Sequence, residues 1–180
     1  MTVSRTRGIP DPYRARRGLT PEVERVLRSR TNATIGSVNP DGTPHLARVW
    51  FLWDDNRVYF EGSSATRKAR NIAANGLASV LVKGKAADGS TLVVLGQGTG
   101  RVLTGDEAGE ICARIRGKYL TAEGMDPVSR YLDGIDDAVG ELTPGRWATW
   151  SLRSMKAAIR ALPEYEDDDT WDRWFLPESE

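Results

Sequence analysis

Hydrophobic and polar residues alternate with a period of two over several stretches of this chain, which indicates β-strands with one buried face. The stretch 33–38 leads through the turn sequence Asn-Pro-Asp-Gly into a long run at 43–53, so a β-hairpin is predicted. A third strand at 57–61 follows another short turn and completes an antiparallel meander. The long run is apolar on both faces, which is typical of a strand inside a barrel or at a subunit contact.

Later in the chain, further strands are predicted at 77–82, 92–103 and 146–152. Gly96, Gly98 and Gly100 punctuate the second of these strands. Because glycine weakens a strand, the three residues indicate bends, a bulge, or a close approach of a ligand or partner backbone.

Elsewhere the hydrophobic period lengthens to that of a helix. Thr20 and Pro21 have the chemistry of an N-cap and a first helical residue, so a short opening helix is predicted. Residues 63–75 are helical in pattern and Gly76 follows as a left-handed stop. Thr104 to Glu107 matches a capping box before a helix of about four turns. Weaker helical spacing occurs at 126–137 and 155–162.

The 180 residues suffice for one domain, which the pattern predicts to be mainly β with a few helices. Residues 20–162 are assigned to this domain. A basic arm at 1–19 and an acidic tail at 163–180 flank it, either as solvated ends or as arms that clasp a neighbouring subunit.

Composition excludes several classes of partner. The 25 basic and 25 acidic residues balance, so the net charge favours neither nucleic acid nor an anionic membrane. Cys112 is the only cysteine and cannot form an internal disulfide. No apolar run approaches the roughly 18 residues of a membrane helix, and a cytoplasmic protein is expected.

Catalysis by the chain's own groups is not indicated. His45 is the only histidine and Cys112 the only cysteine, so no zinc-like ligand set and no metal site is predicted. A serine triad would need the same histidine, and no Gly-x-Ser-x-Gly elbow is present. We therefore predict no catalytic side chain.

The junction between the third strand and the helix near Thr66 is the most informative segment. Backbone N–H groups and the positive helix end favour an anion there. Hydroxyl and cationic donors are added by Ser63, Ser64, Thr66, Arg67 and Lys68. This pattern predicts a site for a phosphate monoester, although ordinary helices also begin with such residues.

Two further features accompany the junction. Arg48 lies on an otherwise apolar strand, where either an anionic ligand or a salt bridge would compensate its charge. Trp50, Trp53, Trp147 and Trp150 lie on predicted strands and could either fill the core or form walls for a planar ring. A phosphate site with aromatic walls and few acids or bases suggests that a bound cofactor performs the chemistry.

The ordered segments 44–51, 58–60 and 67–72 resemble the pyridoxamine-phosphate-oxidase-like FMN-binding split barrels, and the likeness spans residues 21–152. The resemblance implies a six-stranded antiparallel split β-barrel with Greek-key-like connections. It also implies a homodimer with the cofactor held between the subunits. The residues carried over as cofactor-binding are Arg48, Val49, Trp50, Glu61, Gly62, Ser63, Thr66, Arg67, Lys68, Trp147 and Trp150.

By this resemblance the chain is expected to be an oxidoreductase that transfers hydride between bound FMN and a small organic substrate. A reductase using the deazaflavin coenzyme F420 and a non-catalytic carrier of flavin or haem are the alternatives. Trp53 stands where true pyridoxamine 5'-phosphate oxidases carry a lysine, and their Arg/His-rich C-terminal signature is missing. A vitamin-pathway oxidase is therefore not expected.

Overall fold

Buried and more exposed side chains alternate along the strands, which form one curled antiparallel sheet. The computed structural model describes residues 15–16, 19–132, 134–153 and 156–157. Its strands are β1 (Ala15–Arg16), β2 (Ala33–Val38), β3 (Pro44–Val49), β4 (Phe51–Asp54), β5 (Arg57–Gly62), β6 (Leu77–Lys85), β7 (Thr91–Thr104) and β8 (Ala138–Trp150). They are hydrogen-bonded in the order β3-β2-β6-β7-β8-β5-β4, and β1 pairs with β8.

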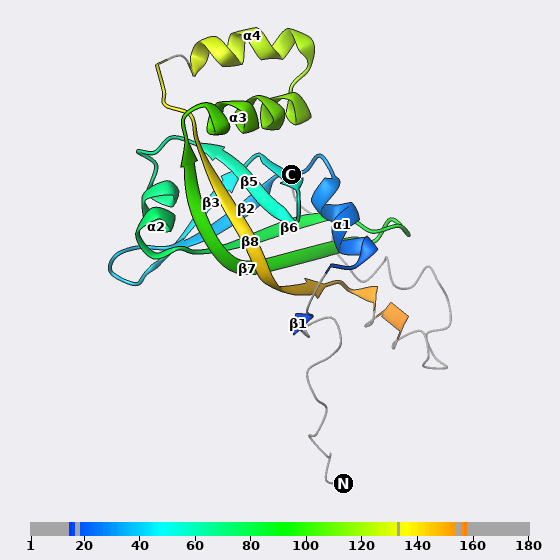
Figure 1. Cartoon of the computed structure of the whole chain (residues 1–180). Helices are drawn as coiled ribbons and strands as arrows, with labels where there is room; N and C mark the ends of the chain where they lie inside the picture. The colour runs from blue at the N-terminus through cyan, green and yellow to red at the C-terminus, as the bar shows by residue number, and fades with distance from the viewer. Residues whose placement is uncertain (1–14, 17–18, 133, 154–155, 158–180) are drawn as a thin grey trace.

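The sheet closes into a split barrel at Trp50. β3 and β4 stand at opposite ends of the strand order, yet only Trp50 separates them along the chain, so the sheet must curl to bring its ends together (Figure 1). The predicted single strand over 43–53 is therefore wrong, because its first half pairs with β2 and its second half with β5. If β3 and β4 are counted as one bent strand, the barrel has six strands, as predicted. The short β1 is additional to these six.

Gly98 marks a bulge between β7 and β8, which is one of the explanations that the sequence favoured. The register of the pair shifts between Gln97 and Gly98. A Cβ on Gly98 would lie 2.0 Å from the Thr143 carbonyl oxygen, so only glycine allows this approach. The last strand was predicted at 146–152, but β8 begins at Ala138 and continues through Pro144, which the bulge accommodates.

The helices with defined bounds among the described residues are α1 (Pro21–Arg28), α2 (Arg67–Asn75), α3 (Asp106–Tyr119) and α4 (Ala122–Tyr131). The first two confirm the predicted signals, because the Thr20 hydroxyl accepts the Val23 amide at 3.2 Å and Gly76 ends α2 with φ of 66°. None of the described helices is long and apolar enough to cross a membrane.

The start of α3 and the position of α4 differ from the sequence prediction. The capping box at Thr104 is wrong, because Thr104 is the last residue of β7 and Gly105 occupies the N-cap position with φ of 73°. α4 begins after Thr121, whose hydroxyl accepts the Gly124 amide, and the left-handed Gly134 then separates the helix from β8. The helix predicted over 126–137 is therefore shifted towards the N-terminus.

Two apolar clusters hold these elements together. The interior of the barrel contains the buried face of α1, with Val26 and Leu27 packed in one cluster with Phe51 and Phe60. A second cluster lies between the sheet and the face of α3 that carries Ile115. In Figure 1, α3 and α4 lie together beyond one end of the strands. The arm at 1–19, the tail at 163–180 and the helical spacing at 155–162 fall almost entirely outside the described residues.

Candidate functional site

A cleft of about 530 Å³ opens beside the point where the barrel closes. One side is formed by the end of β3 and by the chain from β5 to α2. The predicted residues on this side are Arg48, Val49, Trp50, Glu61, Gly62, Ser63, Thr66 and Lys68. Asn32, α3, α4 and the loop before β8 complete the cleft. The structure thus brings eight of the eleven predicted site residues together, although their role stays a prediction.

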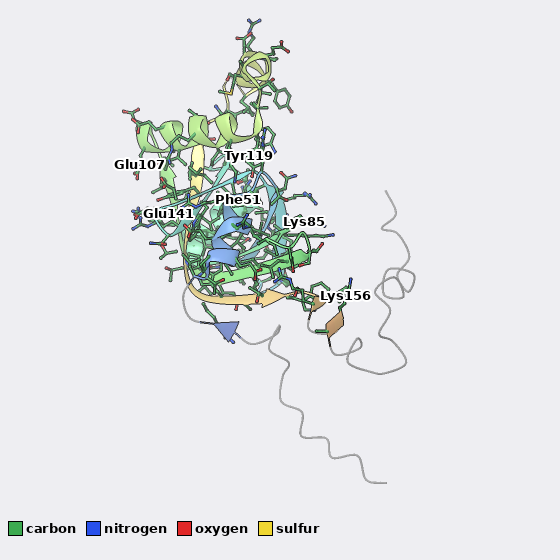
Figure 2. All side chains as sticks on the ribbon, turned by 90° about the vertical axis from the view of Figure 1, so that its right-hand side faces the viewer. Phe51, Lys85, Glu107, Tyr119, Glu141 and Lys156 are labelled. Carbon is green, nitrogen blue, oxygen red and sulfur yellow. The ribbon has the colours of Figure 1, made fainter. Side chains whose placement is uncertain are left out.

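The Trp50 ring forms a wall that α3 holds in place. It stacks on Tyr119 with ring centroids 5.2 Å apart and an interplanar angle of 4°. The Tyr119 hydroxyl donates to the Thr31 carbonyl at 2.6 Å and accepts the Phe51 amide at 3.3 Å. Figure 2 shows Tyr119 at the end of α3 above Phe51. The Lys118 ammonium also donates to the Phe51 carbonyl at 3.1 Å. The side chains of Lys118 and Tyr119 therefore both hold the backbone next to Trp50.

Arg48 projects from β3 into the cleft and is exposed. It makes no hydrogen bond or ion pair with any residue that the structure describes. The salt bridge that the sequence left open as an explanation is thus not present among these residues. An exposed guanidinium with five donors remains available to an anionic ligand.

The N-terminal end of α2 leaves donors open. Thr66 occupies the N-cap position, but its hydroxyl donates to the Ser63 carbonyl at 2.7 Å and caps no helix amide. The first amides of the helix therefore keep their capacity for an external acceptor. Lys68 extends over Gly62, where an added Cβ would lie 2.9 Å from Nζ. Burial lowers the pKa of Lys68, the charge of Glu61 opposes this, and no hydrogen bond or ion pair engages the ammonium within the described chain.

Asp136 occupies two of the donors that the sequence assigned to a phosphate. Its carboxylate accepts the Ser63 hydroxyl at 2.5 Å and the Ser64 amide at 2.9 Å. These hydrogen bonds from Ser63 and Ser64 lower the pKa of Asp136 to about 2, so the carboxylate is charged at neutral pH. Sequence reasoning missed Asp136, because it lies 72 residues from Ser64 and no local spacing links them.

Arg116 was also missed, and it pairs with two of the carboxylates in the cleft. Its guanidinium donates to Glu61 at 2.7 Å and to Asp137 at 2.7 Å. Glu61, Cys112 and Asp137 present ligand atoms within 4.8 Å of one another, as a metal site would. Arg116 already supplies the compensating positive charge, and burial raises the pKa of the Cys112 thiol to about 12. The cluster is therefore better described as an ion-pair network over an unreactive thiol.

Three predicted site residues lie away from the cleft. Arg67 is exposed and lines a separate depression with Asp41 and Arg70. Trp147 is 4% exposed and packs edge-on against Trp53 with centroids 5.8 Å apart, which is the core-filling role. Trp150 is half-buried at the end of β8. A contribution of the two tryptophans to a pocket of a second subunit stays a prediction.

The outer wall of the cleft is apolar and comes from α4 and the segment after it. Val128, Tyr131, Leu132 and Ile135 line it. Tyr131 and Ile135 are 81% and 50% exposed, and no residue of α4 is buried. Together with Trp50, this wall encloses an apolar space beside unpaired cations and open helix amides. Such an arrangement can bind a planar ring that carries an anionic group.

Comparison with known proteins adds a family and several similar folds. A model of the pyridoxamine 5'-phosphate oxidase family matches residues 19–151. A conserved hypothetical protein from Mycobacterium tuberculosis has a similar structure, with a TM-score of 0.62 and 19% identity over 84% of this chain and 93% of that chain. Among the curated proteins, no significant match was found.

Two further solved structures carry cofactor names. An F420 reductase is 25% identical, with a TM-score of 0.51 over 69% of this chain and 94% of the reductase. A FAD-binding protein from Mesorhizobium loti is 16% identical, with a TM-score of 0.51 over 75% of this chain and 96% of that protein. The latter likeness supports the fold alone.

Proposed function

The chain belongs to the pyridoxamine 5'-phosphate oxidase family, and from this premise we propose that its cleft binds FMN and transfers hydride between the flavin and a small organic substrate. The observation that carries the proposal is the pair of unpartnered cations, Arg48 and Lys68, beside the open end of α2. A phosphate dianion would compensate the charge of Lys68 and accept the free helix amides, while Arg48 would keep its donors for the part of the cofactor next to the ring. Trp50 provides the apolar wall for the ring.

The residues of the chain would bind and orient the cofactor rather than react. The bound ring would supply the site that accepts or donates the hydride. Lys68 and the first amides of α2 would hold the phosphate, and Arg48 would contact the part of the cofactor next to the ring. Tyr119 fixes the plane of Trp50, while the wall made by Val128 and Leu132 would limit access of water to the ring.

The substrate is proposed to differ from that of the enzyme that gives the family its name. By the resemblance, Trp53 stands at the position of a substrate-binding lysine. In the structure it is 5% exposed and packs against Trp147. This position therefore offers no cation for a second phosphate. An uncharged or weakly polar organic molecule fits the apolar outer wall better.

A homodimer is proposed to complete the site. The outer face of β3, β2 and β6 carries three exposed leucines, Leu46 at 70%, Leu77 at 53% and Leu81 at 42% exposure. An apolar face of this kind is costly in water, and a second copy of the chain would cover it. Arg48 lies on the same outer face of β3 as Leu46, which would bring the second copy close to the cleft.

Coenzyme F420 is the second candidate for the cofactor. The similarity to an F420 reductase at 25% identity favours it, and F420 also carries a phosphate and a tricyclic ring. Titration of the purified apo protein with FMN and with F420, followed by fluorescence, ranks the two directly. Absorption and mass spectra of any molecule that co-purifies provide an independent identification.

Lys68→Ala tests the phosphate site. We expect FMN binding to weaken roughly tenfold to a hundredfold, because a charge-assisted hydrogen bond is lost, while riboflavin binding stays almost unchanged. The matched variant Arg67→Ala removes the neighbouring charge from outside the cleft and is expected to weaken FMN by less than about threefold. Isothermal titration with both flavins measures this. An equal loss for FMN and riboflavin would remove Lys68 from the phosphate site.

A further inference from the structure

We propose that Asp136 is an internal competitor of the cofactor phosphate, and that phosphate binding must displace it and release the outer wall of the cleft. The inference rests on the proposed function, because it concerns the ligand of the same site. Asp136 would thus lower the affinity of the cleft for the cofactor phosphate.

The first ground is that the carboxylate occupies phosphate-type donors. The Ser63 hydroxyl and the Ser64 amide converge on Asp136 at 2.5 and 2.9 Å. The Ala65 amide supports this arrangement by donating to the Ser63 hydroxyl oxygen at 3.1 Å. A hydroxyl and a backbone amide just before a helix are the donors that phosphate oxygens accept in other proteins. Here an anion from the same chain satisfies them.

The second ground is electrostatic. Arg116 forms ion pairs with Glu61 and Asp137, whereas Asp136 has only the neutral donors Ser63 and Ser64 as hydrogen-bonding partners among the described residues. Its carboxylate therefore has no ion-pair partner among the described residues, and it lines the same cleft that would receive a dianion. A phosphate held by the first amides of α2 would lie next to Ser63 and Ser64, where its charge would repel the Asp136 carboxylate and its oxygens would compete for the same two donors.

The third ground is how the segment around Asp136 is attached. Asp137 is held by Arg116 at 2.7 Å, so the chain is anchored directly after Asp136. On the other side, Gly134 has φ of 82° and α4 contributes no buried residue. Loss of the Asp136 contacts would therefore free the wall made by Tyr131 and Ile135 while β8 stays in place. Phosphate binding and access to the ring would thus be coupled.

Asp136→Asn tests the competition, because asparagine keeps an acceptor for Ser63 and Ser64 but loses the charge. We expect inorganic phosphate and FMN each to bind roughly tenfold more tightly to this variant, with riboflavin unchanged. The matched control Asp126→Asn removes an exposed charge from α4 and should leave all three affinities as in the original protein. Calorimetric titration on the full-length chain provides the affinities.

Hydrogen exchange of residues 128–136 provides the second readout. In the original protein, saturating phosphate is expected to speed exchange in this segment. In Asp136→Asn, exchange without phosphate is expected to be faster than in the original protein, because a neutral amide accepts the two hydrogen bonds more weakly than a carboxylate does. Unchanged or weaker phosphate binding to Asp136→Asn would overturn the inference. Failure of the proposed function is distinguishable, since then neither FMN nor F420 would bind to either protein, whatever phosphate does.

Discussion

α3 and α4 follow each other in the chain and both line the cleft, but they are held in opposite ways. α3 buries Ala108, Ile111, Cys112 and Ile115 against the sheet and clamps the chain next to Trp50 through Lys118 and Tyr119. α4 buries no residue, and the segment after it is fixed by Asp136 and Asp137. The cleft therefore combines a wall that packing preorganises with a wall that polar contacts hold.

The largest expected difference between the two helices concerns stability. Ile115→Ala removes a fully buried side chain from the cluster under α3 and should lower the free energy of unfolding by about 3 kcal/mol. Ile135→Ala, next to α4, is expected to cost less than about 0.5 kcal/mol, because Ile135 is half exposed. Urea unfolding measures both. Similar costs for the two variants would mean that the α4 region is packed as firmly as α3.

A smaller difference is expected between two arginines. Arg116→Met leaves Glu61 and Asp137 without their partner; the side chains of Arg116 and Glu61 are 13% and 15% exposed, so we expect a loss of about 2 kcal/mol. Arg130→Met breaks the exposed pair with Asp126 on α4 and should cost less than about 0.5 kcal/mol. Thermal unfolding compares the variants. If Arg116→Met proved neutral, the network would not contribute to the fixed wall.

The smallest expected effect is the pH dependence that Lys118 introduces at the end of α3. Burial lowers the pKa of Lys118 to about 8, below its usual value of 10.5. Between these values the unfolded chain binds more protons than the folded one, so stability should rise with pH relative to Lys118→Met. The increase is expected to be about 1 kcal/mol after solvent screening.

The comparison with Lys118→Met is needed because Cys112 acts in the opposite direction. Its pKa of about 12 lies above the usual 9, so stability falls with pH in that interval, equally in both proteins. The difference between the two unfolding curves from pH 7 to 10.5 therefore isolates Lys118. A difference that does not change with pH would show that the ammonium is solvated in the folded protein.

Features that depend on neighbouring residues could be predicted from the sequence. The Thr20 cap, the Gly76 stop and the grouping of residues 61–68 at a strand-to-helix junction depend on contacts along a short stretch of chain. For this reason, the sequence could predict the residues on the barrel side of the cleft. The division of the long strand at Trp50 was not, because it depends on which strands pair with each half.

The other half of the cleft could not be predicted, because its contacts join distant parts of the chain. Arg116 and Glu61 are 55 residues apart, and Asp136 and Ser64 are 72 apart. Neither pair has a characteristic spacing. The spacing of apolar residues in a helix likewise does not show whether these residues are buried, as in α3, or face a cleft, as in α4.

The junction at Trp50 also limits how the chain can change in length. Val49, Phe51 and Trp53 all face the interior, so the alternation of sides continues unbroken across the switch of pairing partner. One inserted or deleted residue there would turn Phe51 and Trp53 away from the interior and place Leu52 and Asp54 inside. The loop at 86–90 tolerates such changes, since only the β6–β7 turn would lengthen. Natural length variation should therefore collect in that loop and be absent at Trp50.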